Sequence, residues 1–569
     1  MERLKDKIMK RFSLFLVLIL MTIFVSGCVV PGGSTSGTGN GSGSNGGGGT
    51  VTDPYAGEFG KPIEQDLTTT NILDDNYRNY YEIFVQAFSD SDYDGNGDLR
   101  GVINKLDYLQ DLGYTGIWLM PIHPSNSYHK YDVIDFYSVH NTYGTIDDLK
   151  ELIDECHKRD IKLILDLVLN HSSIASDYFK KACAAYDKKL KGQSLTEEEK
   201  QFVDFYTFYP TQSAAPAGIT TRKVSDKYNF YYECNFSDQM PEFNCDSQYV
   251  KNEFKNIVKY YLDMGIDGFR LDAVKYYYYN NATKNINFLK EFNSWVKAIN
   301  PKAYIVGECW SGASEIKNYY TSGVDSFFNF TECVKSASTS GSINGINPNG
   351  NGINTYYNAL VNNVTMAGNS IPAPFLDNHD TPRYTYISSV EKNKFVFGLL
   401  SMMNGTIFSY YGDEVGLYGS NATGPDENVR QPIKWGDFTQ PDCNPISGIT
   451  KLEYPYPTVK EQLRDDNSIL NYYKKALLIR NQNPEIARGT IKQIKLDKTN
   501  QMLVISKTYN GKTIGIVYNF SNSNNLVIKC NTYGFSQVVG QLVANSSHYV
   551  GEQRDGSIII PPYSIVILR

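Results

Sequence analysis

Short apolar runs alternate with amphipathic segments along most of the chain. Runs such as 80–88 (YYEIFVQAF) and 161–169 (IKLILDLVL) are continuous, which is typical of parallel strands buried on both faces. Helical patterns lie between them, for example 145–160, where Thr145 is a good N-cap. The pattern predicts eight strands, over residues 80–88, 114–122, 161–169, 267–274, 303–308, 325–330, 373–379 and 405–411.

The chain leaves room for a helix after each expected strand except the third, which predicts an α/β fold built on a (β/α)8 TIM barrel. After strand three comes a long irregular stretch, 172–241, which we interpret as a small inserted domain. The barrel domain is then expected in two parts, 71–171 and 242–487. Alternating β segments follow over 488–569 and predict a C-terminal antiparallel β-sandwich.

The first residues are typical of an export signal. Basic residues precede an apolar run that is shorter than a transmembrane helix normally needs, and the run ends at VSGC. This resembles a bacterial lipoprotein signal, with residues 1–27 removed and Cys28 lipidated; a plain secretory signal is the alternative. Residues 28–70 begin with a Gly/Ser-rich stretch and are interpreted as a tether. The expected location is the bacterial cell surface, through a lipid anchor in the membrane.

Composition narrows the possible partners. The formal net charge is -7 and no basic run follows the N-terminus, so no nucleic-acid partner is expected. Tyrosine is common, with 44 residues, and its flat apolar face can stack on sugar rings. The alternative is that these residues pack in a partly solvated core. The cysteines are scattered and fit neither a disulfide scaffold nor a zinc pattern; a Cys234–Cys245 bridge and free thiols both stay open. We expect a monomer.

Three expected strands end in carboxylates: Asp272, Glu308 and, just beyond its strand, Asp380. In a barrel all carboxyl ends meet at one face, so these residues should converge. Arg270 stands two positions before Asp272, on the same side of the strand, and would keep it ionised. Two carboxyls about 5–5.5 Å apart, one ionised and one protonated, make a retaining glycosidase.

Four short segments stand at expected strands in this order: DLVLNH (166–171), GFRLDAVKY (268–276), GECW (307–310) and FLDNHD (375–380). In them the chain resembles α-amylases of glycoside hydrolase family 13, and the resemblance runs from about residue 71 to the C-terminus. It implies that Asp272 is the nucleophile, Glu308 the general acid/base and Asp380 the transition-state stabiliser. It also implies substrate-binding roles for Tyr131, His129, His171, Arg270, Lys275 and His379.

The stretch DSDYDGNGDLRG (90–101) has acidic residues on alternate positions, as in an oxygen cage for a hard cation. A helix–loop–helix calcium loop needs Glu at its twelfth place, where this chain has Gly101. The stretch resembles instead the metal loop after the first barrel strand in members of family 13. That implies a structural Ca²⁺; a polar turn without metal is the alternative, and a second site near Asn170 stays open. The implied ligands are Asp90, Asp92, Asp94, Asn96 through its carbonyl, and Asp98.

The same resemblance bears on the bond cleaved. DAVK, which contains Lys275, resembles α-1,4-acting amylases. MPEFN (240–244) lies between the patterns of oligo-1,6-glucosidases and neopullulanases, and its Met-Pro resembles neopullulanases and the amylases intermediate between the two groups. We therefore predict endo-acting, retaining hydrolysis of α-1,4-glucosidic bonds in starch and maltooligosaccharides. The alternatives are a neopullulanase- or α-glucosidase-like enzyme with α-1,6 or transglycosylation activity, and a non-catalytic, membrane-tethered glucan binder.

Overall fold

The computed structural model describes residues 57, 59–330, 351–359, 370–387, 389–436, 442–450, 452 and 456–569. The predicted signal peptide, Cys28 and most of the predicted tether lie outside these residues. Within them, no helix has the length and apolar character needed to span a bilayer.

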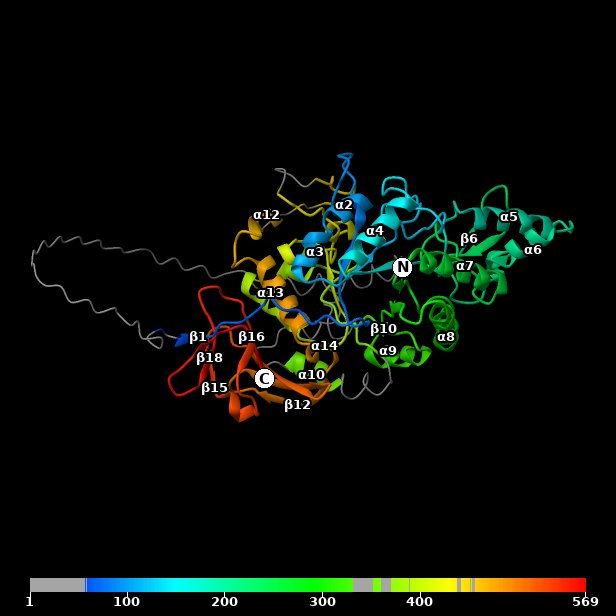
Figure 1. The fold of residues 1–569 in the computed structure, drawn as a ribbon. Coiled ribbons are helices and arrows are strands. Elements are labelled where there is room, and N and C mark those ends of the chain that lie inside the picture. Colours follow the sequence, from blue (N-terminus) through cyan, green and yellow to red (C-terminus); the bar gives the residue numbers. More distant parts are fainter. Residues whose placement is uncertain are drawn as a thin grey trace, which may run out of the picture. The chain divides into compact units, whose positions relative to one another are not determined.

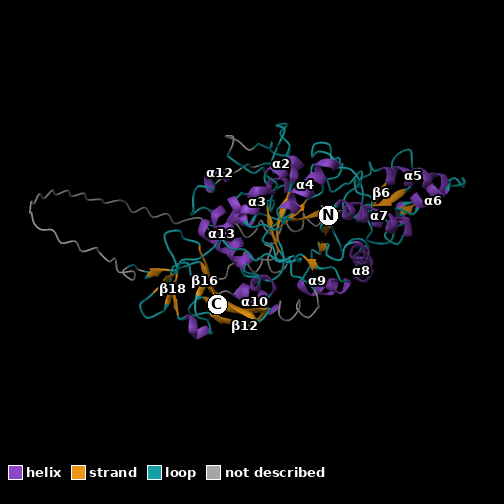
Figure 2. Ribbon diagram, viewed as in Figure 1, coloured by secondary structure: helices purple, strands orange, loops and turns teal. Residues whose placement is uncertain are grey.

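Seven parallel strands form one curled sheet in the order β10-β9-β8-β4-β3-β2-β11. Figures 1 and 2 show helices around the central strands. Parallel bridges join Phe328 to Ala373 and Phe375 to Phe408, so residues 373–375 lie between β10 and β11 and close the sheet. The predicted (β/α)8 barrel is thereby confirmed. Its strands are β2 (Asn79–Ile83), β3 (Gly116–Leu119), β4 (Lys162–Leu167), β8 (Gly268–Leu271), β9 (Tyr304–Gly307), β10 (Ser326–Phe327) and β11 (Ile407–Tyr410).

Helices surround this sheet, and local signals explain where several of them begin and end. Thr145 and Asp148 form a capping box at the start of α4, and Gly113 ends α3 with a φ of 96° that favours glycine. The helices of the barrel domain and its C-terminal edge are α2 (Leu99–Asn104), α3 (Leu106–Leu112), α4 (Ile146–Lys158), α7 (Gln248–Met264), α8 (Ala282–Ile299), α9 (Ala313–Tyr319), α10 (Asn351–Ala359), α11 (Val390–Ser401), α12 (Val459–Gln462), α13 (Ile469–Gln482) and α14 (Glu485–Arg488).

Aromatic side chains fill the inside of the barrel. Tyr80 stacks on Tyr304 at 5.5 Å and on Phe408 at 5.0 Å between ring centroids. Trp118 and Phe328 belong to the same buried cluster. The barrel is therefore a packed core, and chemistry is confined to the carboxyl ends of the strands.

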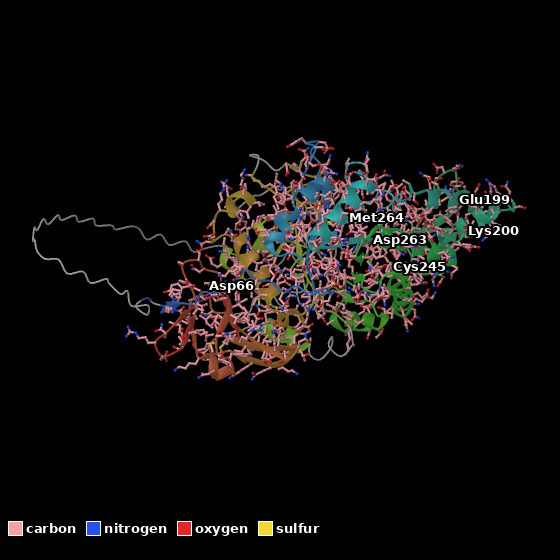
Figure 3. The ribbon with its side chains drawn as sticks, in the orientation of Figure 1. Asp66, Glu199, Lys200, Cys245, Asp263 and Met264 are labelled. Atoms are coloured by element: carbon pink, nitrogen blue, oxygen red, sulfur yellow. The ribbon has the colours of Figure 1, made fainter. Side chains whose placement is uncertain are left out.

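The inserted domain follows β4 and carries its own small sheet, in the order β5-β7-β6. It is tied to the barrel at Glu253 of α7, whose Oε1 accepts hydrogen bonds from Tyr137 (2.9 Å) and Tyr178 (2.5 Å). Cys234 and Cys245 are buried free thiols (Figure 3 labels Cys245). The elements of this domain are α5 (Asp177–Leu190), α6 (Glu197–Val203), β5 (Phe208–Tyr209), β6 (Thr221–Lys223) and β7 (Tyr231–Glu233).

The C-terminal domain is a sandwich of two antiparallel sheets, as predicted, with one buried cluster contributed by both. The first is β12-β13-β14-β19-β16 and the second is β1-β17-β18-β15. Strand β1 lies in the segment predicted as tether; it pairs with β17, so the chain is already part of the sandwich before residue 70. The strands are β1 (Lys61–Pro62), β12 (Thr490–Asp497), β13 (Met502–Tyr509), β14 (Lys512–Asn519), β15 (Leu526–Ile528), β16 (Val538–Val543), β17 (Gly551–Glu552), β18 (Ile558–Ile560) and β19 (Ser564–Leu568).

Candidate active site

The three predicted catalytic carboxylates all lie at the carboxyl face of the barrel. Asp272 directly follows β8, and Glu308 directly follows β9. The backbone N–H of Glu308 still donates to the carbonyl of Leu271, at 2.9 Å, so the two strand ends run side by side. Asp380 follows the segment that closes the barrel between β10 and β11. Residues far apart in sequence are brought together by strand register.

Arg270, on β8, is the cation at the centre of this site and is 1 % exposed. Its Nη1 donates to Asp272 Oδ1 at 2.6 Å, and its Nη2 pairs with Glu308 Oε2 at 2.8 Å. Asp166 lies opposite Arg270 in the β4–β8 register and accepts from Nη1 at 2.8 Å. One planar guanidinium therefore holds the predicted nucleophile and the predicted acid next to each other.

Glu308 is in an environment that favours its neutral form. Burial raises the pKa of Glu308 to about 8; the Arg270 cation opposes this shift, and the charges of Asp272 and Asp380 add to it. Oε2 accepts from Arg270 and from the backbone N–H of Ala273 at 3.0 Å, which leaves Oε1 to carry the proton. A carboxylic acid that keeps its proton at neutral pH can donate it to a leaving group.

Asp380 lies between two cations. Its Oδ2 is 3.0 Å from Nε2 of His379, and its Oδ1 accepts from Nη2 of Arg430 at 2.9 Å. Burial would raise the pKa of Asp380, but His379 and Arg430 outweigh it and hold that pKa below its usual range. Burial also disfavours a charged His379, yet Asp380 and Glu82 raise the pKa of His379 to about 10. Asp380 is therefore a fixed negative charge.

The predicted sugar-holding residues Tyr131, His171, His129 and His379 form one group. Tyr131 donates to Asp166 at 2.9 Å and stacks on His379, with ring centroids 5.5 Å apart. Nε2 of His171 lies 3.1 Å from the carbonyl oxygen of Tyr131. Nδ1 of His129 accepts from the Tyr131 backbone N–H at 3.1 Å. The loop after β3 is thus fixed against the carboxylates.

Lys275 is placed differently from the other predicted substrate ligands. Its Nζ donates to the carbonyl oxygen of Trp310 at 3.2 Å and to Ser311 Oγ at 3.3 Å, and lies 3.4 Å from a carboxylate oxygen of Glu315. It therefore ties the segment after β8 to the segment after β9.

Three residues of the site were not singled out from the sequence: Asp166, Glu82 and Arg430. Asp166 had a signal, since it begins the DLVLNH segment at a strand end. Glu82 had one as well, as the charged residue inside the apolar run of β2. Arg430 follows a short 3-10 turn in an irregular region, where no periodic pattern marks it.

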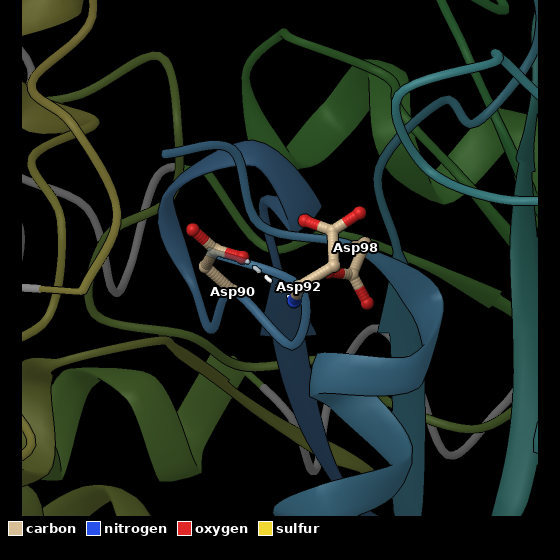
Figure 4. A group of neighbouring side chains, drawn as sticks. All are labelled: Asp90, Asp92 and Asp98. Atoms are coloured by element: carbon tan, nitrogen blue, oxygen red, sulfur yellow. Dashed lines mark hydrogen bonds between the residues drawn. The ribbon is translucent and has the colours of Figure 1, made fainter. Parts of the chain in front are cut away.

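Three of the five predicted metal ligands come together in the loop after β2. Carboxylate oxygens of Asp90, Asp92 and Asp98 lie within 4.8 Å of one another (Figure 4). The Asp94 carboxylate is not in this group, and its Oδ1 accepts from the backbone N–H of Asn96 at 2.7 Å and from the Asn96 side chain at 3.1 Å. The role of the Asn96 carbonyl stays a prediction. Among the described residues, no lysine, arginine or histidine pairs with any of the three clustered carboxylates. Hard oxygen donors without a protein cation fit a Ca²⁺ ion.

Comparison with known proteins agrees with this geometry. Residues 82–489 match the family model "Alpha amylase, catalytic domain". The chain is similar to Alpha-amylase 3 of Dictyoglomus thermophilum, with 34% identity over 87% of this chain and 93% of the relative. It is also similar to a 4-alpha-glucanotransferase of Thermotoga maritima, with 29% identity over 78% of this chain and 95% of the relative.

A solved structure, Eubacterium rectale Amy13B, covers 88% of this chain and 96% of its own at 36% identity, with a TM-score of 0.79. The family model spans well over half of the chain. This chain belongs to the α-amylase catalytic-domain family, glycoside hydrolase family 13.

Proposed function

We propose that this glycoside hydrolase is an endo-acting α-amylase that cleaves α-1,4-glucosidic bonds in starch and maltooligosaccharides with retention of configuration. The observation that carries the retaining mechanism is the fork of Arg270, which contacts Asp272 and Glu308 with different nitrogens, and the similarity to a protein named Alpha-amylase 3 supports the α-1,4 bond. This fork sets the Asp272 carboxyl beside Glu308, whose pKa burial raises to about 8. A retaining glycosidase pairs a carboxylate nucleophile with a protonated carboxylic acid.

In the proposed reaction a carboxylate oxygen of Asp272 attacks C1 of the sugar, and the C1–O4 bond breaks. Glu308 gives its proton to O4 of the leaving chain, so a glycosyl-enzyme ester and a shortened glucan result. Water then adds to C1, returning its proton to Glu308 and freeing Asp272. Asp380 would balance the positive charge that develops on the sugar in each transition state.

The remaining residues would hold the sugar being cleaved. Tyr131 presents a ring beside His379, and His171 reaches the same loop, so a glucosyl unit would meet an aromatic face and imidazole N–H groups. Arg270 would hold the carboxyl groups of Asp272 and Glu308 in position. Lys275 contacts Trp310 and Ser311 instead of standing free, so its predicted role as a direct substrate ligand needs a test.

Transfer to a second glucan is the alternative reaction of the same glycosyl-enzyme. The similarity to a protein named 4-alpha-glucanotransferase supports transfer as an alternative, and the MPEFN segment supports α-1,6 cleavage as another. A non-catalytic glucan binder is disfavoured, because all three carboxylates and Arg270 are in place.

The test is the product pattern of the purified protein on amylose, pullulan and isomaltose, followed over time by chromatography. A spread of maltooligosaccharides from amylose with isomaltose intact supports an endo-α-1,4 enzyme. Longer products than the starting oligosaccharide identify transfer, and cleavage of isomaltose or release of glucose alone overturns the endo-α-1,4 assignment. No product with amylose still bound favours the tethered binder.

Two further proposals concern the rest of the chain. The carboxylates of Asp90, Asp92 and Asp98 would hold a structural Ca²⁺, which would add stability and take no part in bond cleavage. Cys28 would carry the lipid that keeps a monomeric enzyme at the bacterial surface, and mass spectrometry of the exported protein tests this directly.

A further inference from the structure

Strand β2 carries one charged residue, Glu82, close to its carboxyl end. The residue is 1 % exposed, and a carboxyl group buried in this way is costly unless it has a partner. The partner is His379, which lies 297 positions away in the sequence: Oε1 of Glu82 is 2.5 Å from Nδ1 of the imidazole. The contact joins the first strand of the barrel to the residue that precedes Asp380.

Both nitrogens of the His379 ring face hydrogen-bond acceptors. Nε2 lies 3.0 Å from Oδ2 of Asp380 and 2.8 Å from the hydroxyl oxygen of Tyr131. That hydroxyl donates its own proton to Asp166 at 2.9 Å, so it can only accept from the ring. Nε2 must therefore carry a proton, and Nδ1 must carry one as well unless Glu82 holds it instead.

The charges nearest the ring favour a proton on Nδ1. Burial lowers the pKa of His379, but Asp380 and Glu82 raise it to about 10. Burial raises the pKa of Glu82, whereas His379 and Arg270 act against that rise. Arg430 donates from Nε to the carbonyl oxygen of His379 and from Nη2 to Asp380, both at 2.9 Å. With Glu82 ionised, the two carboxylates and the two cations of this group balance.

The other groups around the ring are uncharged or bound elsewhere. Tyr131 stacks on the imidazole and Trp118 meets it edge-on, with centroids 5.5 and 5.7 Å away. Burial raises the pKa of Tyr131 well above its usual value and lowers the pKa of His129 to about 4, so both are neutral near pH 7. Burial raises the pKa of Asp166 to about 7, and Arg270 holds that carboxyl at 2.8 Å. Glu82 is therefore the counter-charge that meets the ring at Nδ1.

We propose that Glu82 is a positioning residue that keeps His379 as an imidazolium and cancels its charge from behind the ring. The inference rests on the proposed retaining hydrolysis, in which positive charge develops on the sugar and Asp380 balances it. His379 and Arg430 both contact Asp380. Without Glu82 this group would carry one net positive charge beside the sugar and would oppose the transition state.

The experiment measures kcat/KM on α-maltosyl fluoride from pH 5 to pH 9.5. Fluoride leaves without protonation, so this substrate reports the attack of Asp272 without the acid step of Glu308. Glu82→Gln keeps the size of the side chain and can hydrogen-bond to Nδ1 in either state of the ring. Its uncompensated imidazolium should lower kcat/KM at pH 6 about tenfold, or ~1.4 kcal/mol.

The loss in Glu82→Gln should depend on pH. Without Glu82 the pKa of His379 falls from about 10 toward its ordinary value of about 6.5. As pH rises the ring then loses its proton and the net charge returns to zero, so most of the loss should be recovered by pH 8.5. The unmodified enzyme should show no such rise.

Two matched variants separate charge from structure. Glu82→Asp keeps the negative charge and should keep the pH profile of the unmodified enzyme, even where its kcat/KM is lower. Tyr81→Phe, on the same strand, removes a buried hydroxyl that donates to Glu414 at 2.8 Å. It should lower the free energy of unfolding and leave the pH profile unchanged.

A second measurement uses the unmodified protein and does not depend on how the variants fold. NMR of ¹⁵N-histidine-labelled protein, with the His379 signals assigned by their loss in His379→Gln, should show protons on both ring nitrogens from pH 6 to pH 9. An unprotonated Nδ1 at pH 7 would place the proton on Glu82 and overturn the proposal.

The kinetic results can overturn it as well. A Glu82→Gln profile like that of the unmodified enzyme, or a loss that is equal at every pH, would mean that Glu82 only supports the fold. Failure of the proposed function looks different, since the unmodified enzyme would then leave maltohexaose intact whatever the charge of His379.

Discussion

Two groups of carboxylates in this protein are held in opposite ways. On the catalytic face, Asp272 and Glu308 meet the guanidinium of Arg270, and Asp380 meets Arg430. In the loop after β2, the groups that donate hydrogen bonds to the carboxylates are uncharged. Oδ1 and Oδ2 of Asp90 accept from backbone N–H groups, and Asp98 accepts from backbone N–H groups and a serine hydroxyl.

The difference explains what each group can do. A built-in cation orients the carboxyls that contact it and repels metal ions, so the carboxyls of the barrel face need no ion from solution. Backbone N–H groups orient a carboxylate without neutralising it. The loop is left with clustered negative charge, and a cation from solution would complete it. Substitutions in the two groups should therefore have different effects.

The largest effect is expected from Asp272→Asn. The substitution keeps the shape of the side chain but removes the anionic oxygen that would attack C1, so hydrolysis of maltohexaose should fall by about 10⁴-fold or more. Affinity electrophoresis in amylose should show retained binding. A variant that keeps more than a tenth of the activity would mean that another group is the nucleophile.

The loop should respond to calcium instead. At a free calcium concentration of 100 times the dissociation constant, the free energy of unfolding should rise by about 2.7 kcal/mol, measured in urea with and without chelator. Asp92→Asn should abolish most of that increment, because Asp92 belongs to the clustered group. Asp94→Asn is the matched control and should keep more of it, since the Asp94 carboxylate lies outside the clustered group.

Equal calcium responses in these two variants would restore Asp94 as a ligand, as the sequence suggests. A protein indifferent to calcium would leave the loop as a polar turn. In either case kcat on maltohexaose at saturating calcium should match that of the unmodified enzyme, because the loop lies outside the network around Arg270.

The third prediction concerns the protonation state of Glu308. Burial raises the pKa of Glu308 to about 8, and the acid is active only while it holds its proton. Activity on glucans should therefore persist to near pH 8 and fall as pH rises, by about thirtyfold at pH 9.5. α-Maltosyl fluoride is the control, because fluoride leaves without protonation. The initial burst of fluoride from this substrate should not show the fall in rate above pH 8, which we call the alkaline limb. An alkaline limb shared by both substrates would mean that a group other than Glu308 titrates.

The sequence was sufficient for the residues that end strands. Asp272, Glu308 and Asp380 follow apolar runs, and barrel geometry brings such ends together. The position of Arg270 beside Asp272 could be predicted because side chains two residues apart on a strand point to the same side. The barrel, the inserted domain and the sandwich could be predicted because the spacing of apolar residues changes from one part of the chain to the next.

The rest depended on contacts without a local pattern. Arg430 reaches Asp380 from an irregular loop, and β1 pairs with β17 across almost the whole chain. A two-residue edge strand has no periodicity to detect, so the predicted tether ran too far. Asp94 fitted the alternation of the acidic loop, but its carboxylate lies outside the cluster of Asp90, Asp92 and Asp98, which only the three-dimensional path of the loop decides.

The smallest effect is expected at Ala273, which joins the two predicted catalytic residues through its backbone. It follows Asp272, has a φ of 47°, and donates its N–H to Glu308 at 3.0 Å. A left-handed conformation costs roughly 1–2 kcal/mol for residues with a Cβ and most for β-branched ones. Ala273→Val should therefore lower both the free energy of unfolding, by about 1 kcal/mol, and kcat/KM, by about fivefold.

Ala273→Gly is the matched variant, since glycine accepts this φ and keeps the N–H. Its relief of strain is partly offset by the greater freedom of glycine in the unfolded chain, so its stability should stay within about 0.5 kcal/mol of the unmodified protein. The alkaline limb should stay near pH 8 in the glycine variant and move in the valine variant, because only valine disturbs the donor to Oε2. A limb that moves equally in both would show that the N–H of residue 273 does not set the acidity of Glu308.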